Sequence, residues 1–374
     1  MSDLPKEPEA EPLGTPAATW WNANTILVLI IAIVAVGGVL RLMGGIFVPL
    51  VIALLLSFVF SPLVSLLVKI KIPRFLAITL VLLIFLTAGF LLGLIVYSSI
   101  GSLVREFPRY QSRITSLLSE TLRELDLPAG VVNEINIAGR ISSAFFQVSS
   151  DFMSFAGSFT VVLIFLLFLL MEKPYLRKKV NNALKDNTTR RIAIIFAHIN
   201  GQIGRYIGVK LLVSSLTAVV VYIAFRFIGV DFPFIWAVLT FLFNFIPSIG
   251  SVAITVLSAI FAVLQFLPDW QSIFAVVISM GSAQFIIGNV LDPKLLGDRL
   301  NLSPVVILFS LLAWGWLWGI AGLFLAVPLT VAIKIVFENI PGLEPIGILM
   351  GTGNYRQRRR RGVNRKPREE NPPV

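Results

Sequence analysis

Polar residues recur along the helix predicted at 273–290 and into the segment GNVLDPKLLGDRLNLSPVV, residues 288–306, where charge, proline and glycine are expected to interrupt the helix near Asp292 and Pro293. Gln284, Gly288 and Asp292 are four residues apart, so these positions stack on one helix face, with Asn289 on the adjacent edge. Such a stripe is expected to face neighbouring helices or a cavity, because a polar group exposed to lipid costs free energy. The candidate ligands for a solute or an ion are Gln284, Asn289, Asp292 and Pro293.

The chemistry of Asp292 admits two interpretations. A partly desolvated carboxylate can bind a proton and a cation in competition, which favours a role in transport. Lys294 could instead neutralise Asp292 from two residues away, which would make the two a structural ion pair at a helix end. The sequence leaves both interpretations open.

A second interruption occurs in the segment FLFNFIPSIGSVAI, residues 241–254. Proline lacks a backbone N–H and glycine tolerates conformations that interrupt a helix, so a helix is expected to break here. Irregular backbone at membrane depth persists only where it is buried in protein or lines an aqueous cavity. The segment is therefore either a tight turn at the membrane surface or a discontinuous element that faces the substrate. Its candidate ligands are Asn244, Pro247, Ser248 and Gly250.

Composition excludes several kinds of chemistry. The chain has no cysteine and a single histidine, His198, which rules out thiolate sites and a multi-histidine metal site within one subunit. Neither GxxxxGK[ST] nor GxSxG occurs, so nucleotide hydrolysis and serine-hydrolase chemistry are not expected. We expect a protein that is not an enzyme and has no catalytic residue, metal or cofactor.

The whole chain has the composition of a polytopic membrane protein. Of its 374 residues, 56% are hydrophobic and 14% are charged, whereas about a quarter are charged in soluble domains. Apolar runs long enough to cross a bilayer are predicted at residues 25–42, 46–68, 75–100, 152–171, 207–228, 232–246, 252–267 and 273–290. A last run, 303–337, is broken by glycines and a proline, which predicts two short spans or a bent hairpin.

The predicted fold is therefore all-α, with about eight transmembrane helices, Pro/Gly-broken or re-entrant hairpins and an amphipathic helical arm. Apolar residues at helical spacing from Phe107 to Leu125 predict the arm, which we expect to pack on a neighbouring subunit. The predicted divisions are a disordered acidic tail at 1–24, N-terminal spans at 25–100, the arm at 101–151, a span and a basic cytoplasmic segment at 152–206, the C-terminal transport core at 207–340 and a basic tail at 341–374.

The distribution of positive charge predicts the orientation of the chain. The formal net charge is +11, and the basic residues gather in KIKIPR at 69–74, in the segment 172–191 and in the C-terminal tail. Even numbers of predicted crossings separate the three regions, so all can be cytoplasmic, together with both termini. The tail is better explained as a topology anchor that touches anionic lipid than as a nucleic-acid-binding segment.

Several separated motifs resemble, in the same order, the signatures of the autoinducer-2 exporter family of bacterial permeases. They are FVPLVIALLLSFVFSPLVSLLVKIKIPRFLAI, GQIGRYIGVKLLVS, NFIPSIGSV and NVLDPKLLGDRLNLSPVVILFSLLAWGWLWGIAGLFLAVPLT, within residues 25–340. The family's IP-x-x-G pattern falls on Ile246, Pro247 and Gly250, although Ser248 stands where the family often has Tyr. Its acidic-Pro-x-x-x-Gly pattern falls on Asp292, Pro293 and Gly297, with Asp where Glu is frequent.

The resemblance implies an integral protein of the bacterial inner membrane. Members of the family are associated with export of the quorum-sensing signal autoinducer-2, and others with exchange of sodium or lithium for protons. The family's G-x-x-G…P element falls on Gly319, Gly322 and Pro328, which would form a structural hinge. Homo-oligomers such as pentamers, with a mobile transport element, are also implied.

Three functions are compatible with these observations. The first is secondary export of a small polar solute such as autoinducer-2, with a proton carried on Asp292. The second is antiport of a monovalent cation, Na+ or Li+, against protons at the same carboxylate. The third is a non-transporting membrane scaffold in which the polar breaks are architectural. The expected partners are a small polar solute, H+ or Na+, membrane lipids and copies of the same chain.

Overall fold

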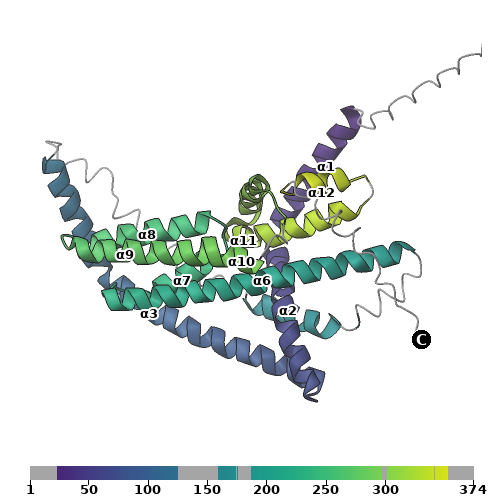
Figure 1. The fold of residues 1–374 in the computed structure, drawn as a ribbon, viewed down its shortest axis with the longest axis horizontal. Coiled ribbons are helices and arrows are strands. Elements are labelled where there is room, and N and C mark those ends of the chain that lie inside the picture. Colours follow the sequence, from purple (N-terminus) through teal and green to yellow (C-terminus); the bar gives the residue numbers. More distant parts are fainter. Residues whose placement is uncertain are drawn as a thin grey trace, which may run out of the picture. The chain divides into compact units, whose positions relative to one another are not determined.

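The computed structural model describes residues 23–124, 159–173, 175, 187–296, 301–340 and 342–352. Every regular element in these ranges is a helix, which confirms the predicted all-α fold (Figure 1). The helices are α1 (Ala23–Leu42), α2 (Gly44–Lys69), α3 (Arg74–Glu124), α6 (Asn187–Ile228), α7 (Pro233–Phe243), α8 (Ile249–Phe266), α9 (Trp270–Ala283), η1 (Gln284–Leu291), α10 (Asp292–Leu296), α11 (Pro304–Asn339) and α12 (Glu344–Leu349). The acidic tail before residue 23, the arm beyond residue 124 and the basic tail beyond residue 352 lie outside the described residues.

Six helical stretches in the described part of the chain are long and apolar enough to cross a membrane. They are Gly44–Lys69, Arg74–Ser99, His198–Ile228, Ile249–Phe266, Trp270–Leu296 and Pro304–Asn339. Two shorter apolar helices, Ile30–Leu42 and Pro233–Phe243, fall on two further predicted runs. The outer surfaces of these helices expose many large apolar side chains, as is expected of surfaces that contact lipid.

Residues up to Gly44 and residues from Gly45 onward form two compact units. In the first unit α1 exposes Leu27, Val28 and Ile31. In the second unit, α2, α3 and the helical residues 159–173 share a core that includes Ala53, Ile78 and Leu166. The helix-internal prolines Pro49 and Pro62 do not end α2.

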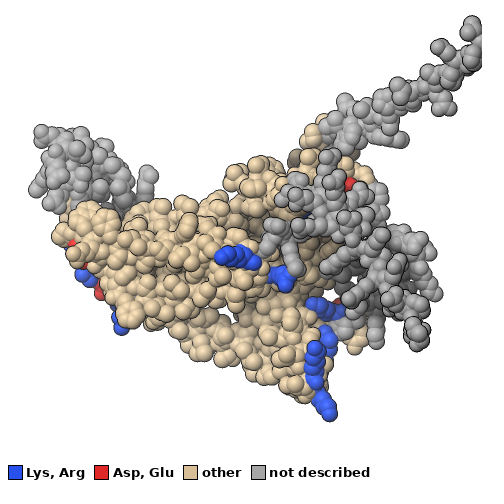
Figure 2. All heavy atoms as spheres, in the orientation of Figure 1, with Lys and Arg blue, Asp and Glu red and all other residues tan. Residues whose placement is uncertain are grey.

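The α6–α9 helices build a separate core within the second unit. Val221 and Phe225 of α6 cluster there with Val276 and Met280 of α9, and these helices run side by side in Figure 1. Figure 2 shows mainly uncharged side chains over α8 and α9. The basic residues Lys69, Lys71 and Arg74 are exposed where α2 ends and α3 begins.

The α3 helix is continuous through residue 100, where the third predicted span ends. Residues 101–124 of the predicted arm therefore continue the helix of the third span and do not form a separate helix. Its Tyr110 is buried against Phe261 of α8, with ring centroids 5.2 Å apart. The change from an apolar to an amphipathic sequence does not coincide with a break in the backbone.

Two helical elements are broken sharply, as the prolines and glycines predict. Between α7 and α8 the chain turns at residues 244–248, where Ser248 has a positive φ of 59°. In α11 the backbone leaves the helical region at Trp318 and Gly319, whose φ is 58°. Gly322 then lies so close to the carbonyl of Trp314 that a Cβ would be 1.8 Å from its oxygen. The last apolar run is thus a bent hairpin, one of the two predicted alternatives.

Candidate functional site

The centre of the site is an ion pair between two buried side chains. The ammonium of Lys210, on α6, lies 2.5 Å from Asp292 Oδ2, on α10. Whole-residue exposure is 7% for Lys210 and 9% for Asp292. The other carboxylate oxygen, Asp292 Oδ1, is buried and has no hydrogen-bond partner among the described residues. One oxygen of the carboxylate is therefore held by the protein, and the other is available to a ligand.

The pair corrects the structural interpretation of Asp292. Lys294 is exposed, and the cation that neutralises the carboxylate comes from 82 residues earlier in the chain. The pair joins two elements that are distant in sequence, which a local pair at a helix end would not do. Sequence reasoning missed Lys210, although a lysine inside an apolar span was itself a signal, because a buried cation requires a partner.

Further polar groups continue along the same face of α6. Tyr206, Lys210, Ser214 and Thr217 are three or four residues apart and all are buried. The hydroxyl of Thr217 donates to the Val213 carbonyl of its own helix, whereas Tyr206 Oη and Ser214 Oγ have no partner among the described residues. A buried polar atom left unpaired costs about 1–3 kcal/mol, so these groups are suited to bind a solute or water.

The facing helix is a π-helix at this point. η1 spans Gln284–Leu291, and the N–H of Asp292 donates to the carbonyl of Ile287, five residues earlier. The expected break at Asp292 and Pro293 is therefore wrong, because the helix continues to Leu296. A proline ring clashes with the carbonyl four residues earlier in an α-helix, and the wider turn before Pro293 relieves that conflict. Short π-helical segments are frequent at functional sites.

Gly288 lies in the middle of η1, with polar atoms converging beside it. A Cβ placed on Gly288 would lie 3.9 Å from Gln284 Oε1 and 4.0 Å from Ser251 Oγ of α8. Gln284 is 5% exposed, and neither its amide oxygen nor its amide nitrogen has a partner among the described residues. Because Gly288 has no side chain, space remains beside the Gln284 amide. The nitrogen of this amide can donate a hydrogen bond to a ligand, and its oxygen can accept one.

The register of the two helices places these groups along one line. Lys210 meets Asp292, and Val221 and Phe225 cluster with Met280 and Val276, so α6 and the 270–296 helix run in opposite directions. Ser214 and Thr217 therefore fall near the level of η1. Along this line, α6 and η1 offer both hydrogen-bond donors and acceptors.

The α7–α8 turn contains Asn244, which is buried and whose Nδ2 has no partner among the described residues. Gly250 is required for the turn, because a Cβ there would lie 1.8 Å from the carbonyl oxygen of Phe243. Ile246 clusters with Leu311 and Ala326 of α11, so this turn packs on the α11 hairpin. The α7–α8 turn and the α11 hairpin, which are the two interrupted elements, therefore pack against each other.

The structure separates the predicted ligands into two groups. Asn244, Gly250, Gln284 and Asp292 are buried, while Pro247 is half-buried. Ser248, Asn289 and Pro293 are exposed, so their side chains do not share the buried polar face of η1 and α6. Of the predicted hinge residues, Gly319 is at the break of α11, and Gly322 and Pro328 are buried beyond it. The structure adds Tyr206, Lys210, Ser214 and Ser251 to the site.

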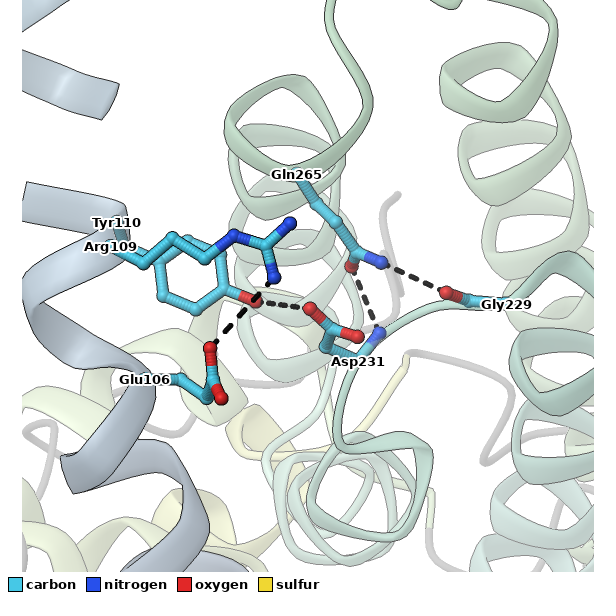
Figure 3. A network of polar contacts seen from close by, with 6 residues as sticks. All are labelled: Glu106, Arg109, Tyr110, Gly229, Asp231 and Gln265. Atoms are coloured by element: carbon cyan, nitrogen blue, oxygen red, sulfur yellow. Dashed lines mark hydrogen bonds and ion pairs between the residues drawn. The ribbon is translucent and has the colours of Figure 1, made fainter. Parts of the chain in front are cut away.

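A second polar network fastens α3 to the loops of the α6–α9 helices (Figure 3). Tyr110 Oη donates to Asp231 Oδ2 at 2.5 Å, and the N–H of Asp231 donates to Gln265 Oε1 at 2.9 Å. Gln265 Nε2 in turn donates to the carbonyl of Gly229, and Arg113 donates to the carbonyl of Leu267. Burial, followed by the hydrogen bond to Asp231, raises the pKa of the Tyr110 hydroxyl. This network holds neutral Tyr110 as a donor.

No group of three or more His, Asp or Glu side chains that could hold a metal ion occurs in the described part of the chain. The buried polar groups described here are one ion pair, the amides of Asn244 and Gln284, and several hydroxyls. Such a set can exchange hydrogen bonds with a polar solute, and the carboxylate can also hold a proton or a cation.

The chain is similar in sequence to known and putative transport proteins. Residues 25–342 match the family model described as AI-2E family transporter. A putative transport protein of Borreliella burgdorferi is 34% identical over 88% of this chain and 91% of its own length. The putative transport protein YhhT of Escherichia coli is 30% identical, over 92% of this chain and 99% of its own. The AI-2 transport protein TqsA of Escherichia coli is 29% identical, over 91% and 99%.

Proposed function

The protein belongs to the AI-2E family of membrane transporters, and from that premise we propose that it exports a small polar solute, similar to autoinducer-2, across the bacterial inner membrane. One observation supports this most strongly: α6 and η1 carry buried polar atoms, and Asp292 carries a carboxylate oxygen, that have no hydrogen-bond partner among the described residues. Hydroxyl groups both donate and accept hydrogen bonds, so a hydroxyl-rich solute matches the mixture of donors and acceptors in the site.

Transport by this site needs Asn244, Gln284 and Asp292 to contact the solute. Each is buried among helices that are otherwise apolar, which separates the solute from lipid. The α7–α8 turn, which contains Asn244, packs on the α11 hairpin that is broken at Gly319, and interrupted helices are typical of the binding sites of transporters. We infer that Gly319, Gly322 and Pro328 act as a hinge.

The test compares cells that lack the gene with cells complemented by it. Accumulation of autoinducer-2 inside and outside the cells is measured together with an untargeted profile of released metabolites. We expect at least one small polar solute to be retained in the deleted strain and released on complementation. Complementation with Asp292→Asn should leave the solute retained. Equal release from deleted and complemented cells would contradict the proposal.

Antiport of a monovalent cation against protons is the second candidate. It is favoured by three buried oxygens that have no partner among the described residues: Asp292 Oδ1, Gln284 Oε1 and Tyr206 Oη. Na+ and Li+ are hard cations and prefer oxygen ligands, as Ca2+ and Mg2+ do. Proteoliposomes loaded with a pH-sensitive dye distinguish the two candidates. A proton flux that follows added Na+ or Li+ and is lost in Asp292→Asn supports antiport, and an unchanged flux in that variant excludes Asp292.

We further infer that the protein is a homo-oligomer with both termini in the cytoplasm. The exposed basic residues Lys69, Lys71 and Arg74 between α2 and α3 support that orientation, because basic loops are retained on the cytoplasmic side. Fluorescent fusions at the C-terminus should mature in the cytoplasm, and periplasmic phosphatase fusions there should be inactive. Native mass spectrometry of the purified protein gives the number of subunits.

A further inference from the structure

The charge of the site is balanced by the protein itself. Lys210 and Asp292 carry opposite charges 2.5 Å apart, and both side chains are about nine-tenths buried. Burying a net charge costs far more free energy than burying a balanced pair. Any charged solute that entered would add an uncompensated charge to a region of low dielectric constant.

Among the described residues around this pair, few other charges are available to offset such a solute. The helices α7, α8, α9 and η1 contain no Asp, Glu, Lys, Arg or His between their bounds. On the neighbouring α11, the buried Lys334 is paired with Glu338 at 2.9 Å. Arg205 of α6 and Lys294 of α10 are exposed. Tyr206, one turn before Lys210, is buried and uncharged in its ordinary phenolic form.

We propose that Lys210 determines the charge specificity of transport: by neutralising Asp292 it makes the site select solutes without net charge. This inference rests on the proposed function, because it takes the same polar face as the path of the solute. Lys210 holds Asp292 Oδ2 and leaves Oδ1 to accept a hydrogen bond from the solute. Gln284 supplies one further donor and one further acceptor, neither of which carries charge.

Removing Lys210 and removing Asp292 should change the charge preference of transport in opposite directions. Without the ammonium, the site has a net charge of about −1 and should favour a cationic solute. Without the carboxylate, its net charge is about +1 and an anionic solute should be favoured. If both charges are removed, the site is neutral again and the original preference should return, although the solute loses one acceptor.

The experiment uses three hydroxyl-rich probes of similar size that differ in charge: glucose, glucosamine and glucuronate. Their release from proteoliposomes is compared for the wild type, Lys210→Met, Asp292→Asn and the double variant. Lys334→Met is the matched control, because it removes a buried lysine that belongs to a different pair. Each purified protein is first checked in detergent, to establish that it is folded and monodisperse.

The wild type and the double variant should release glucose fastest. In Lys210→Met, the ratio of glucosamine to glucose release should rise by about tenfold or more, and in Asp292→Asn the ratio of glucuronate to glucose should rise similarly. The variant Lys210→Glu/Asp292→Lys reverses the pair and should rank the probes as the wild type does. If a single substitution prevents folding, this reversed variant still tests whether Lys210 determines the charge preference.

The outcomes separate the inference from the proposed function. Release of glucose with the same ranking of probes in every folded variant would overturn the role of Lys210 and leave export intact. Equal release of all three probes by the wild type would overturn it as well. Release of none of the probes by the wild type, together with equal solute release from deleted and complemented cells, would overturn both.

Discussion

Tyr110 and Asp231 are separated by 121 residues, yet the tyrosine hydroxyl donates to the carboxylate across 2.5 Å. Tyr110 belongs to α3, and Asp231 belongs to the loop that joins α6 to α7. The aromatic ring of Tyr110 also contacts Phe261, which in turn contacts Trp236 with ring centroids 5.2 Å apart. The bond thus connects α3 to the core of the α6–α9 helices at one partly buried point.

Removing this hydroxyl should destabilise the protein. In Tyr110→Phe the ring contacts remain, but Asp231 loses the donor that satisfies its carboxylate. We expect a loss of about 1–3 kcal/mol in the free energy of unfolding, measured with denaturant in detergent micelles. Tyr97→Phe is the control, because Tyr97 is on the same helix and 70% exposed, and it should change stability by less than about 0.5 kcal/mol. Equal effects of the two substitutions would contradict the importance of the bond.

The same bond predicts instability at alkaline pH. The pKa of Tyr110 is raised, first by burial and then by the hydrogen bond to Asp231, so the folded protein holds the proton more tightly than the unfolded chain does. The stabilisation is therefore complete below the ordinary tyrosine pKa of about 10 and is lost as the pH rises through the folded pKa. Above about pH 10, stability should fall more steeply in the wild type than in Tyr110→Phe. If the stability of the wild type and that of Tyr110→Phe fell equally with rising pH, the prediction would be wrong.

Two glycines should tolerate no side chain at the broken elements. A Cβ at Gly250 or at Gly322 would lie 1.8 Å from a backbone oxygen, of Phe243 and Trp314 respectively, so the backbone must move. We expect Gly250→Ala and Gly322→Ala each to destabilise the protein by about 1–3 kcal/mol. Gly208→Ala, where nothing lies within 4 Å of the added carbon, should be neutral or slightly stabilising. The measurement is the thermal unfolding temperature of each purified variant.

Much of the fold follows from local signals in the sequence. Apolar runs of bilayer length predict the spans, and glycines with prolines predict the breaks near Ser248 and Gly319. The continuity of α3 was not predicted, because a change from apolar to amphipathic pattern does not reveal whether the backbone also turns. The helical geometry at Asp292 was not predicted either, since proline normally ends a helix and the wider π turn that accommodates it has no simple pattern.

The site was predictable only in part, because its key contact is not local. Spacing identified Gln284 and Asp292 on one helix, and both are buried. The partner of Asp292 could not be read from spacing, since α6 and α10 meet through tertiary packing. Proximity in sequence favoured Lys294, whereas the fold brings Lys210 to the carboxylate and leaves Lys294 exposed.

Filling the space at Gly288 should impair transport without unfolding the protein. An added methyl group would contact Gln284 Oε1 at 3.9 Å and Ser251 Oγ at 4.0 Å, which are ordinary contact distances. Gly288→Ala should therefore fold normally and release solute more slowly, and Gly288→Leu should block release. Gly281→Ala is the control, because nothing lies within 4 Å of its added carbon. Solute efflux from complemented cells is measured beside the unfolding temperature, and normal efflux in Gly288→Leu would remove the glycine from the path.

The two lysines that could neutralise Asp292 should differ sharply in stability measurements. Lys210→Met leaves a buried carboxylate without its cation, which costs about 3–5 kcal/mol in comparable proteins. Lys294 is exposed, so Lys294→Met should change stability by less than about 0.5 kcal/mol. In the background of Asp292→Asn the partner charge is already absent, so the further substitution Lys210→Met should be much less destabilising than it is alone. A double-mutant cycle on the free energy of unfolding measures this coupling, and additive effects would show that the ion pair does not stabilise the fold.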